Sequence, residues 1–209
     1  MNIMIIKPRP MAEFLDPTDI TEIFPKQFYI SNYQTAKNKP LIESLGINTI
    51  INVAIELEHD YQDIKVYKYN LEDKHYFKIT NFLDEITDLI HEKITSGKIV
   101  LIHCMAGKSR SASFVLAYLM KYKKMNLEEA YKFFCSKRQV FPNNGFMREL
   151  VEFDKKLFTE SQFDLYKYDR DLIKLYKERG RVDCELVKEI FQHIEGDEVE
   201  KVFYSQITD

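Results

Sequence analysis

Two apolar segments follow one another in the middle of the chain. Residues 98–102 (Lys-Ile-Val-Leu-Ile) form a short, β-branched run that is typical of a buried strand. Residues 112–120 are apolar on nearly every side of a helix, which predicts a helix buried all round. Residues 103–111 connect the two segments and contain a glycine. The pattern therefore predicts a strand, a tight turn and a buried helix.

Strand-like and helix-like patterns of apolar residues also occur on either side of this central stretch. Apolar or alternating runs predict strands at residues 27–31, 47–53 and 64–69. One-sided apolar stretches and their capping residues predict helices at residues 40–46, 79–97, 126–137 and 146–157, with a turn at 142–145. This alternation predicts an α/β fold, in which helices cover both faces of a central, mixed but mostly parallel sheet.

The two ends of the chain differ from this α/β unit, which we assign to residues 25–159. Residues 1–24 contain three prolines among mixed residues, which predicts an irregular N-terminal arm. Residues 160–209 carry two helical patterns, at 165–178 and 184–194, which predict a mainly helical extension. Such an extension would either fold back on the α/β unit or form a surface for a dimer mate or another partner. The helical spacing of its apolar residues fits either arrangement.

Composition and charge exclude several classes of protein. Of the 209 residues, 45% are hydrophobic and 30% are charged, as in ordinary globular domains, and the net charge is -3. Without a general basic field, and without an apolar run long enough for a bilayer, we expect binding to neither nucleic acid nor membrane. The run at residues 1–6 is too short for a secretory signal, and the three cysteines form no disulfide or metal pattern. We therefore expect a cytoplasmic protein, and a nuclear location is also compatible.

The connection between the central strand and helix carries the chemistry. A strand that turns through a glycine into a helix directs backbone N–H groups and the positive end of the helix dipole at one point, which is an anion site. Cys104 stands at its start, where a thiolate is favoured, and Arg110 follows six positions later. Ser111 would donate a hydrogen bond to the thiolate, and His103 would orient the backbone beneath the loop. The N–H groups of this loop and the Arg110 guanidinium would bind the oxygens of a phosphate ester while Cys104 attacks its phosphorus. The expected phosphate-binding residues are Met105, Ala106, Gly107, Lys108, Ser109 and Arg110.

Further segments extend the motif to a family resemblance. The string from His103 to Ser111, the segments 46–53 and 117–120, and Pro-Asn-Asn-Gly-Phe at 142–146 resemble the dual-specificity phosphatases of the cysteine-dependent protein tyrosine phosphatase superfamily. The resemblance covers about residues 24–158 and shows no kinase-docking domain. It implies that phosphotyrosine and phosphoserine or phosphothreonine in proteins are hydrolysed through a cysteinyl-phosphate intermediate, with no metal or other cofactor.

The resemblance also implies a proton donor. Members of the family carry an aspartic acid upstream of the nucleophile that protonates the leaving group and later activates water. By position this is Asp73, which follows a predicted strand. Glu72 is an adjacent rival, whereas Asp84 and Glu85 are weaker candidates because acids are common in the first turn of a helix.

Several alternatives use the same loop. Some phosphoinositide phosphatases carry a lysine in this loop, as Lys108 is here, and so do protein-directed enzymes. A phosphoinositide or an RNA 5′-phosphate is therefore an alternative substrate. A non-catalytic phosphopeptide-binding protein would usually have lost the cysteine, the arginine or the acid. Sulfur transfer and arsenate reduction also use cysteine loops, but the Ser-Arg-Ser ending and the 142–146 turn favour a phosphatase. Cys135 follows two phenylalanines and is expected to be a packed core thiol, which could resolve an oxidised Cys104 only if the fold brings them together.

Overall fold

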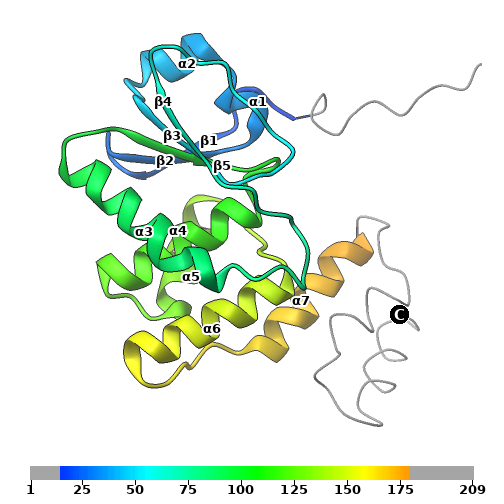
Figure 1. Cartoon of the computed structure of the whole chain (residues 1–209). Helices are drawn as coiled ribbons and strands as arrows, with labels where there is room; N and C mark the ends of the chain where they lie inside the picture. The colour runs from blue at the N-terminus through cyan, green and yellow to red at the C-terminus, as the bar shows by residue number, and fades with distance from the viewer. Residues whose placement is uncertain (1–14, 179–209) are drawn as a thin grey trace, which may run out of the picture. The chain divides into compact units, whose positions relative to one another are not determined.

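The computed structural model describes residues 15–178 of the chain (Figure 1). The strands are β1 (Ile20–Phe24), β2 (Phe28–Ser31), β3 (Thr49–Asn52), β4 (Lys65–Lys68) and β5 (Val100–His103). The helices are α1 (Tyr33–Ala36), α2 (Lys39–Ser44), α3 (Thr80–Thr95), α4 (Arg110–Lys123), α5 (Leu127–Lys137), α6 (Asn144–Phe158) and α7 (Leu165–Glu178).

The strands form one sheet in the order β1-β2-β5-β3-β4. Strands β2, β5, β3 and β4 run parallel to one another, whereas β1 pairs with β2 in the antiparallel sense. All four residues of β5 are buried, in keeping with a strand that has a neighbour on each side and a helical layer on each face. The predicted mixed, mostly parallel sheet is confirmed.

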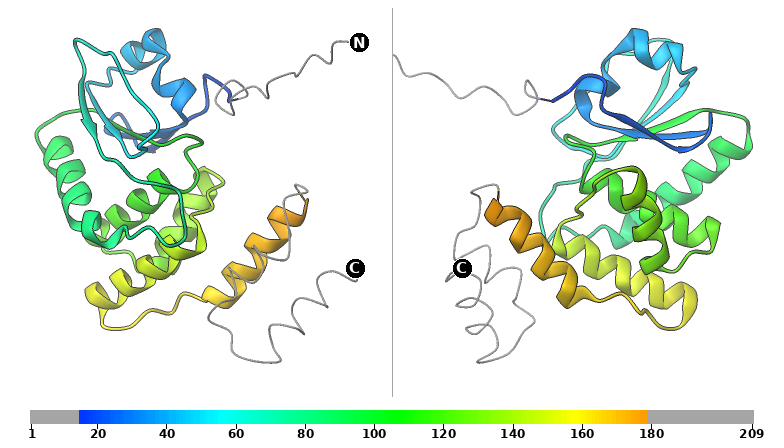
Figure 2. Two further views of the ribbon diagram at one scale, coloured as in Figure 1. Left: turned by 45° about the vertical axis from the view of Figure 1, so that its right-hand side comes forward. Right: turned by 180° about the vertical axis from the view of Figure 1, so that it is seen from behind.

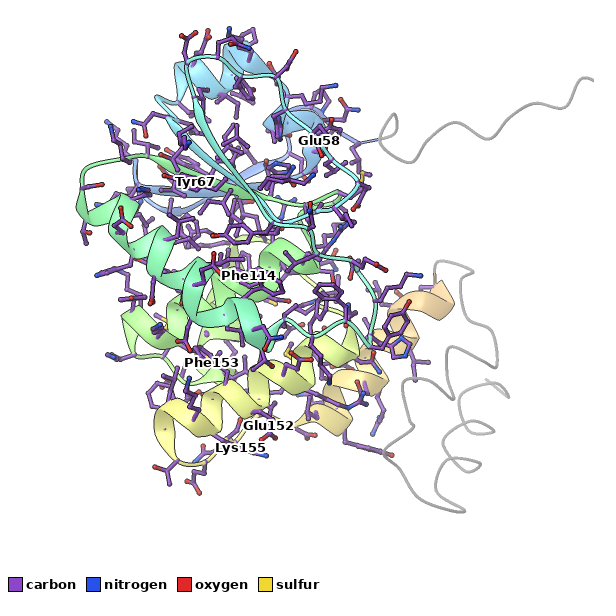
Figure 3. The ribbon with its side chains drawn as sticks, viewed as in Figure 1. Glu58, Tyr67, Phe114, Glu152, Phe153 and Lys155 are labelled. Carbon is purple, nitrogen blue, oxygen red and sulfur yellow. The ribbon has the colours of Figure 1, made fainter. Side chains whose placement is uncertain are left out.

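Helices cover both faces of this sheet (Figures 1 and 2). Helices α1 and α2 lie on one face, where Ala36 and Ile42 pack with Ile50 and Leu101 of the strands. Helices α3, α4, α5 and α6 lie on the other face. All side chains from position 110 to 120 of α4 are buried, among them Phe114, which Figure 3 labels. The prediction of a helix buried all round is therefore confirmed.

Two predicted boundaries differ from the structure. Strand β1 falls within residues 1–24, which were expected to be irregular, because its five residues find an antiparallel partner in β2 that no local signal announces. Helix α6 begins at Asn144 rather than at Phe146, because Asn143 is its N-cap: the Asn143 side chain accepts a hydrogen bond from the Phe146 N–H at 2.9 Å. The expected turn at 142–145 is thus largely the start of the helix.

The chain divides into two compact units, residues 1–162 and 163–209. Helix α7 belongs to the second unit and confirms the helix predicted at 165–178. The helix expected at 184–194 lies outside the described residues. Among residues 15–178, no helix has both the length and the apolar character that crossing a bilayer requires.

Candidate active site

The candidate site lies at the carboxyl end of the central strand. Cys104 directly follows β5, and Arg110 is the first residue of α4. Since β2 and β3 flank β5 in parallel, the loops that follow all three strands meet at this edge of the sheet. Cys104 and Arg110 are 2% and 4% exposed. The sequence predicts phosphate binding at residues 105–110, and we therefore call residues 104–110 the phosphate-binding loop.

The backbone of the phosphate-binding loop has a consistent orientation, because six consecutive carbonyl oxygens, those of residues 104 to 109, accept hydrogen bonds from groups outside the loop. In a planar trans peptide the C=O and the following N–H point in opposite directions. The N–H groups of residues 105 to 110 are therefore directed away from these outer partners, toward the centre of the loop. The donors to the six carbonyls, in order, are His103 Nδ1, the Tyr33 N–H, Arg138 Nη2, Arg138 Nε, the Phe141 N–H and the Ser113 N–H.

Arg138 and Gly107 maintain this loop shape. The Arg138 side chain is buried, donates to the Gly107 carbonyl from Nε at 2.9 Å, and forms a bidentate pair with Asp19 at 2.6 Å for both contacts. Gly107 has φ +66°, and a Cβ atom there would lie 2.5 Å from the Ser31 carbonyl oxygen. Only glycine combines this backbone conformation with such a close approach.

Cys104 and Ser111 lie next to each other, as predicted. The Ser111 hydroxyl donates a hydrogen bond to Cys104 Sγ over 3.2 Å, and the Ser111 side chain is fully buried. His103 Nδ1 lies 3.2 Å from the Cys104 carbonyl oxygen, in the position beneath the loop that the sequence predicted. A thiolate here would face a hydroxyl donor and the N-terminus of α4, both of which favour the anion.

One edge of the Arg110 guanidinium is held by hydrogen bonds, and its Nε edge makes none, although Asp73 Oδ2 lies 3.7 Å from Nε. Glu56 accepts from Nη1 and from Nη2 at 2.6 Å each, and the Leu71 carbonyl accepts from Nη1 at 3.1 Å. Among the described residues, Arg110 Nε has no hydrogen-bond partner. The Nε–H and the outer Nη2–H lie on one edge of the guanidinium plane, where they can donate side by side to two phosphate oxygens.

Glu56 is a site residue that the sequence analysis missed. Burial by itself would raise the pKa of this carboxyl, but the hydrogen bonds and the charge of Arg110 outweigh burial and hold the pKa below its ordinary value. Glu56 is therefore ionised at neutral pH and balances the charge of Arg110. Glu56 lies in the loop that follows β3, and β3 is next to β5 in the sheet. This neighbourhood of the two strands was the only signal that could have placed Glu56 near Arg110.

The fold brings Asp73 to the edge of the phosphate-binding loop. Its Oδ1 accepts from the Ser109 hydroxyl at 2.6 Å and from Asn143 Nδ2 at 2.9 Å, and its Oδ2 lies 3.7 Å from Arg110 Nε. The Asp73 side chain is 35% exposed, so water can reach it. Asn143 thus caps α6 and also fixes the loop that carries Asp73.

The rival acids lack these contacts. Glu72 makes no hydrogen bond or ion pair within the described part of the chain. Asp84 is on α3 and pairs with Lys121 at 2.6 Å and with Lys156 at 2.9 Å, which gives it a structural role. Asp73 is therefore the acid that the geometry favours.

The prediction for Cys135 is wrong. Its side chain is exposed rather than packed in the core, because the buried face of α5 is formed by Leu127, Ala130 and Phe134. Cys135 comes one position after Phe134 and is turned away from this face. Cys104 and Cys135 are both free thiols.

We expect a Glu56→Gln protein to fold normally and to lose about tenfold in kcat/KM on a phosphotyrosine peptide, because the buried guanidinium would lose its counter-charge and its fixed orientation. Steady-state kinetics measure this loss. Glu58→Gln is the matched control: Glu58 is an exposed carboxylate that pairs with Lys68 at 2.8 Å. Equal kinetics for the Glu56→Gln and Glu58→Gln proteins would contradict the role of Glu56.

An α/β sheet with a cysteine after its central strand and an arginine at the start of the next helix agrees with the resemblance of the sequence to the cysteine-dependent phosphatases. Residues 28–156 match the family described as "Dual specificity phosphatase, catalytic domain". This chain belongs to that family. Mouse dual specificity protein phosphatase 18 is 37% identical over 142 residues, which cover 67% of this chain and 76% of the mouse protein.

Solved structures agree with this family. The structure of human DUSP28 has a TM-score of 0.64 and 20% identity, covers 68% of this chain and 97% of its own, and shows the likeness of the fold. The human tyrosine phosphatase-like serine/threonine/tyrosine-interacting protein has a TM-score of 0.61 and 28% identity, over 66% of this chain and 97% of its own. The predicted protein tyrosine phosphatase-like fold is confirmed.

Proposed function

We propose that this chain hydrolyses phosphotyrosine, phosphoserine and phosphothreonine in proteins through a phosphoryl group carried on Cys104. The observation that carries the proposal is the orientation of the phosphate-binding loop. Its carbonyls all accept hydrogen bonds from outer partners, Cys104 lies at one end, and the Nε edge of Arg110, which makes no hydrogen bond among the described residues, lies at the other. Together these groups form a site for a tetrahedral dianion beside a nucleophile.

In the first step the Cys104 thiolate attacks phosphorus. The S–P bond forms while the bond from phosphorus to the substrate oxygen breaks. The loop N–H groups and the Nε–Nη2 edge of Arg110 bind the three equatorial oxygens, on which negative charge accumulates. Asp73 gives its proton to the departing oxygen, because an alkoxide or phenoxide is otherwise a poor leaving group.

In the second step water replaces the thiolate. Asp73, now ionised, accepts a proton from water, the oxygen of that water attacks phosphorus, and the S–P bond breaks. The Ser111 hydroxyl, 3.2 Å from Cys104 Sγ, stabilises the departing thiolate by donating a hydrogen bond. Inorganic phosphate leaves, and the enzyme returns to its first state.

The alternatives differ in substrate or in turnover. The retained cysteine, arginine and acid favour hydrolysis over simple phosphopeptide binding. The net charge of -3 favours phosphoproteins over phosphoinositides or RNA ends. From the sequence we also propose a cytoplasmic or nuclear location. We further propose a dimer or partner contact through residues 160–209.

Phosphate release by the purified full chain tests this function. Peptides carrying phosphotyrosine, phosphoserine or phosphothreonine and a soluble inositol phosphate headgroup are compared in the presence of EDTA. We expect release from all three peptides, and much less from the headgroup. Release from the headgroup alone would overturn the protein substrate, and peptide binding without any release would support the non-catalytic alternative.

A further inference from the structure

A second histidine contacts the ring of His103, and the proposed mechanism does not use it. His59, in the loop between β3 and β4, has its Nε2 2.7 Å from the Nε2 of His103. The two rings are perpendicular, with centroids 4.7 Å apart. Tyr33 stacks on His103 at 6.1 Å and contacts His59 edge-on at 5.6 Å. Tyr33 therefore contacts both rings of the pair.

The partners of His103 determine where the protons lie. The Cys104 carbonyl oxygen can only accept a hydrogen bond, so His103 Nδ1 must carry the hydrogen of that contact. Burial, together with the neighbouring His59, lowers the pKa of His103 to about 3, so the ring is neutral and its Nε2 has a lone pair. His59 Nε2 must therefore carry the hydrogen that joins the two rings.

His59 is itself neutral near pH 7. Burial, followed by the charge of Lys37, lowers its pKa to about 4. The charged groups that face the pair are Lys37, Lys68, Asp60 and Glu58 around His59, and Lys68 and Arg110 around His103. A neutral His59 has one N–H, and the contact with His103 uses it at Nε2.

We propose that His59 is a positioning residue, which fixes the Nδ1–H tautomer of His103 and thereby the direction of the first N–H group of the phosphate-binding loop. The chain of contacts runs from His59 Nε2–H to His103 Nε2, and from His103 Nδ1–H to the Cys104 carbonyl. With that carbonyl held, the Met105 N–H of the same peptide points the opposite way, toward the centre of the loop.

Without the His59 donor, His103 can adopt the other tautomer. A lone pair on Nδ1 would then face the Cys104 carbonyl oxygen, and the first peptide of the loop would lose its anchor. The thiolate and the phosphate would lose one aligned N–H donor. This proposal rests on the proposed role of Cys104, although the tautomers themselves do not depend on turnover.

Two variants separate hydrogen bonding from packing. His59→Phe keeps a planar ring and removes the N–H, whereas His59→Gln keeps a donor. For His59→Phe we expect about a tenfold loss of kcat/KM, and an upward shift of ~1 pH unit in the midpoint for alkylation of Cys104 by iodoacetamide. His59→Gln should keep most of the natural kcat/KM and most of the natural alkylation midpoint. His91→Phe, a change on α3 where His91 stacks on Tyr122, should match the natural chain.

A wild-type alkylation midpoint in His59→Phe would overturn the proposal, as would a His59→Gln protein as impaired as His59→Phe. A measurement on the natural chain covers the case in which His59→Phe fails to fold. Nitrogen-15 histidine NMR reports which ring nitrogens carry hydrogen, and we expect Nδ1–H for His103 and Nε2–H for His59. An Nε2–H signal from His103 would overturn the proposal even if the enzyme is active, and normal tautomers in an inactive protein would instead count against the proposed function.

Discussion

A Cys104→Ser protein is expected to fold as the natural chain does and to lose turnover of phosphotyrosine peptides by on the order of 10⁴-fold or more. Ser111 donates to Cys104 Sγ and lies in the first turn of α4, so a hydroxyl donor and a helix N-terminus would both favour a thiolate there. A serine hydroxyl is far more weakly acidic than a thiol and stays protonated in the same surroundings. The phosphate site would remain, since the loop N–H groups and Arg110 are unchanged.

Phosphate release and peptide affinity, measured on the same preparations, check this expectation. Cys135→Ser is the matched control, because Cys135 is the other free thiol among the described residues and is exposed on α5. Its turnover should equal that of the natural chain, and Cys104→Ser should still bind the phosphopeptide. Normal turnover in Cys104→Ser would remove the cysteine from the mechanism.

An Asp73→Asn protein is expected to lose about 10²–10⁴-fold in kcat on phosphoserine peptides while it retains their binding. The asparagine oxygen can still accept from Ser109 and Asn143, so the loop should keep its place. The amide cannot give a proton to an alkoxide. The loss should be smaller with an aryl phosphate whose leaving group needs little protonation. The variant should therefore hold substrates long enough to recover them as complexes.

Comparison of the two substrate types in one series measures this effect, and Glu72→Gln is its control. Glu72 is adjacent in sequence and makes none of the contacts of Asp73 within the described chain. We expect nearly normal kinetics for Glu72→Gln. If Glu72→Gln lost turnover and Asp73→Asn did not, the acid role would pass to Glu72.

The central features of the site could be predicted because their signals are local. A β-branched run, a glycine turn and an all-apolar helix are contiguous in the sequence, and this order alone specifies a strand, an anion loop and a buried helix. Cys104, Arg110 and Ser111 lie within that stretch, so their positions followed from it. The nearness of Asp73 to the loop required the resemblance to a family.

The supporting contacts could not be predicted, because their partners are far apart in the chain and have no periodic pattern. Asp19 and Arg138 form an ion pair although they lie near opposite ends of the catalytic unit in the sequence. Glu56 reaches Arg110 only because β3 and β5 are neighbours in the sheet. The exposed Cys135 shows a related limit: two preceding phenylalanines indicate a core, but the helical turn places successive residues on different faces.

Detection of the phosphoryl group on Cys104 during turnover tests the central claim most directly. The full chain is mixed with a phosphopeptide labelled on its phosphate, quenched within one turnover, digested and analysed by mass spectrometry. With an aryl phosphate, whose leaving group needs little protonation, Asp73→Asn should still form the intermediate while its hydrolysis slows, so this pairing would increase the amount trapped. We predict one labelled phosphoryl group on the peptide that contains Cys104, and none on that peptide from Cys104→Ser. Phosphate release at the normal rate with no label on Cys104 at any time would contradict the account.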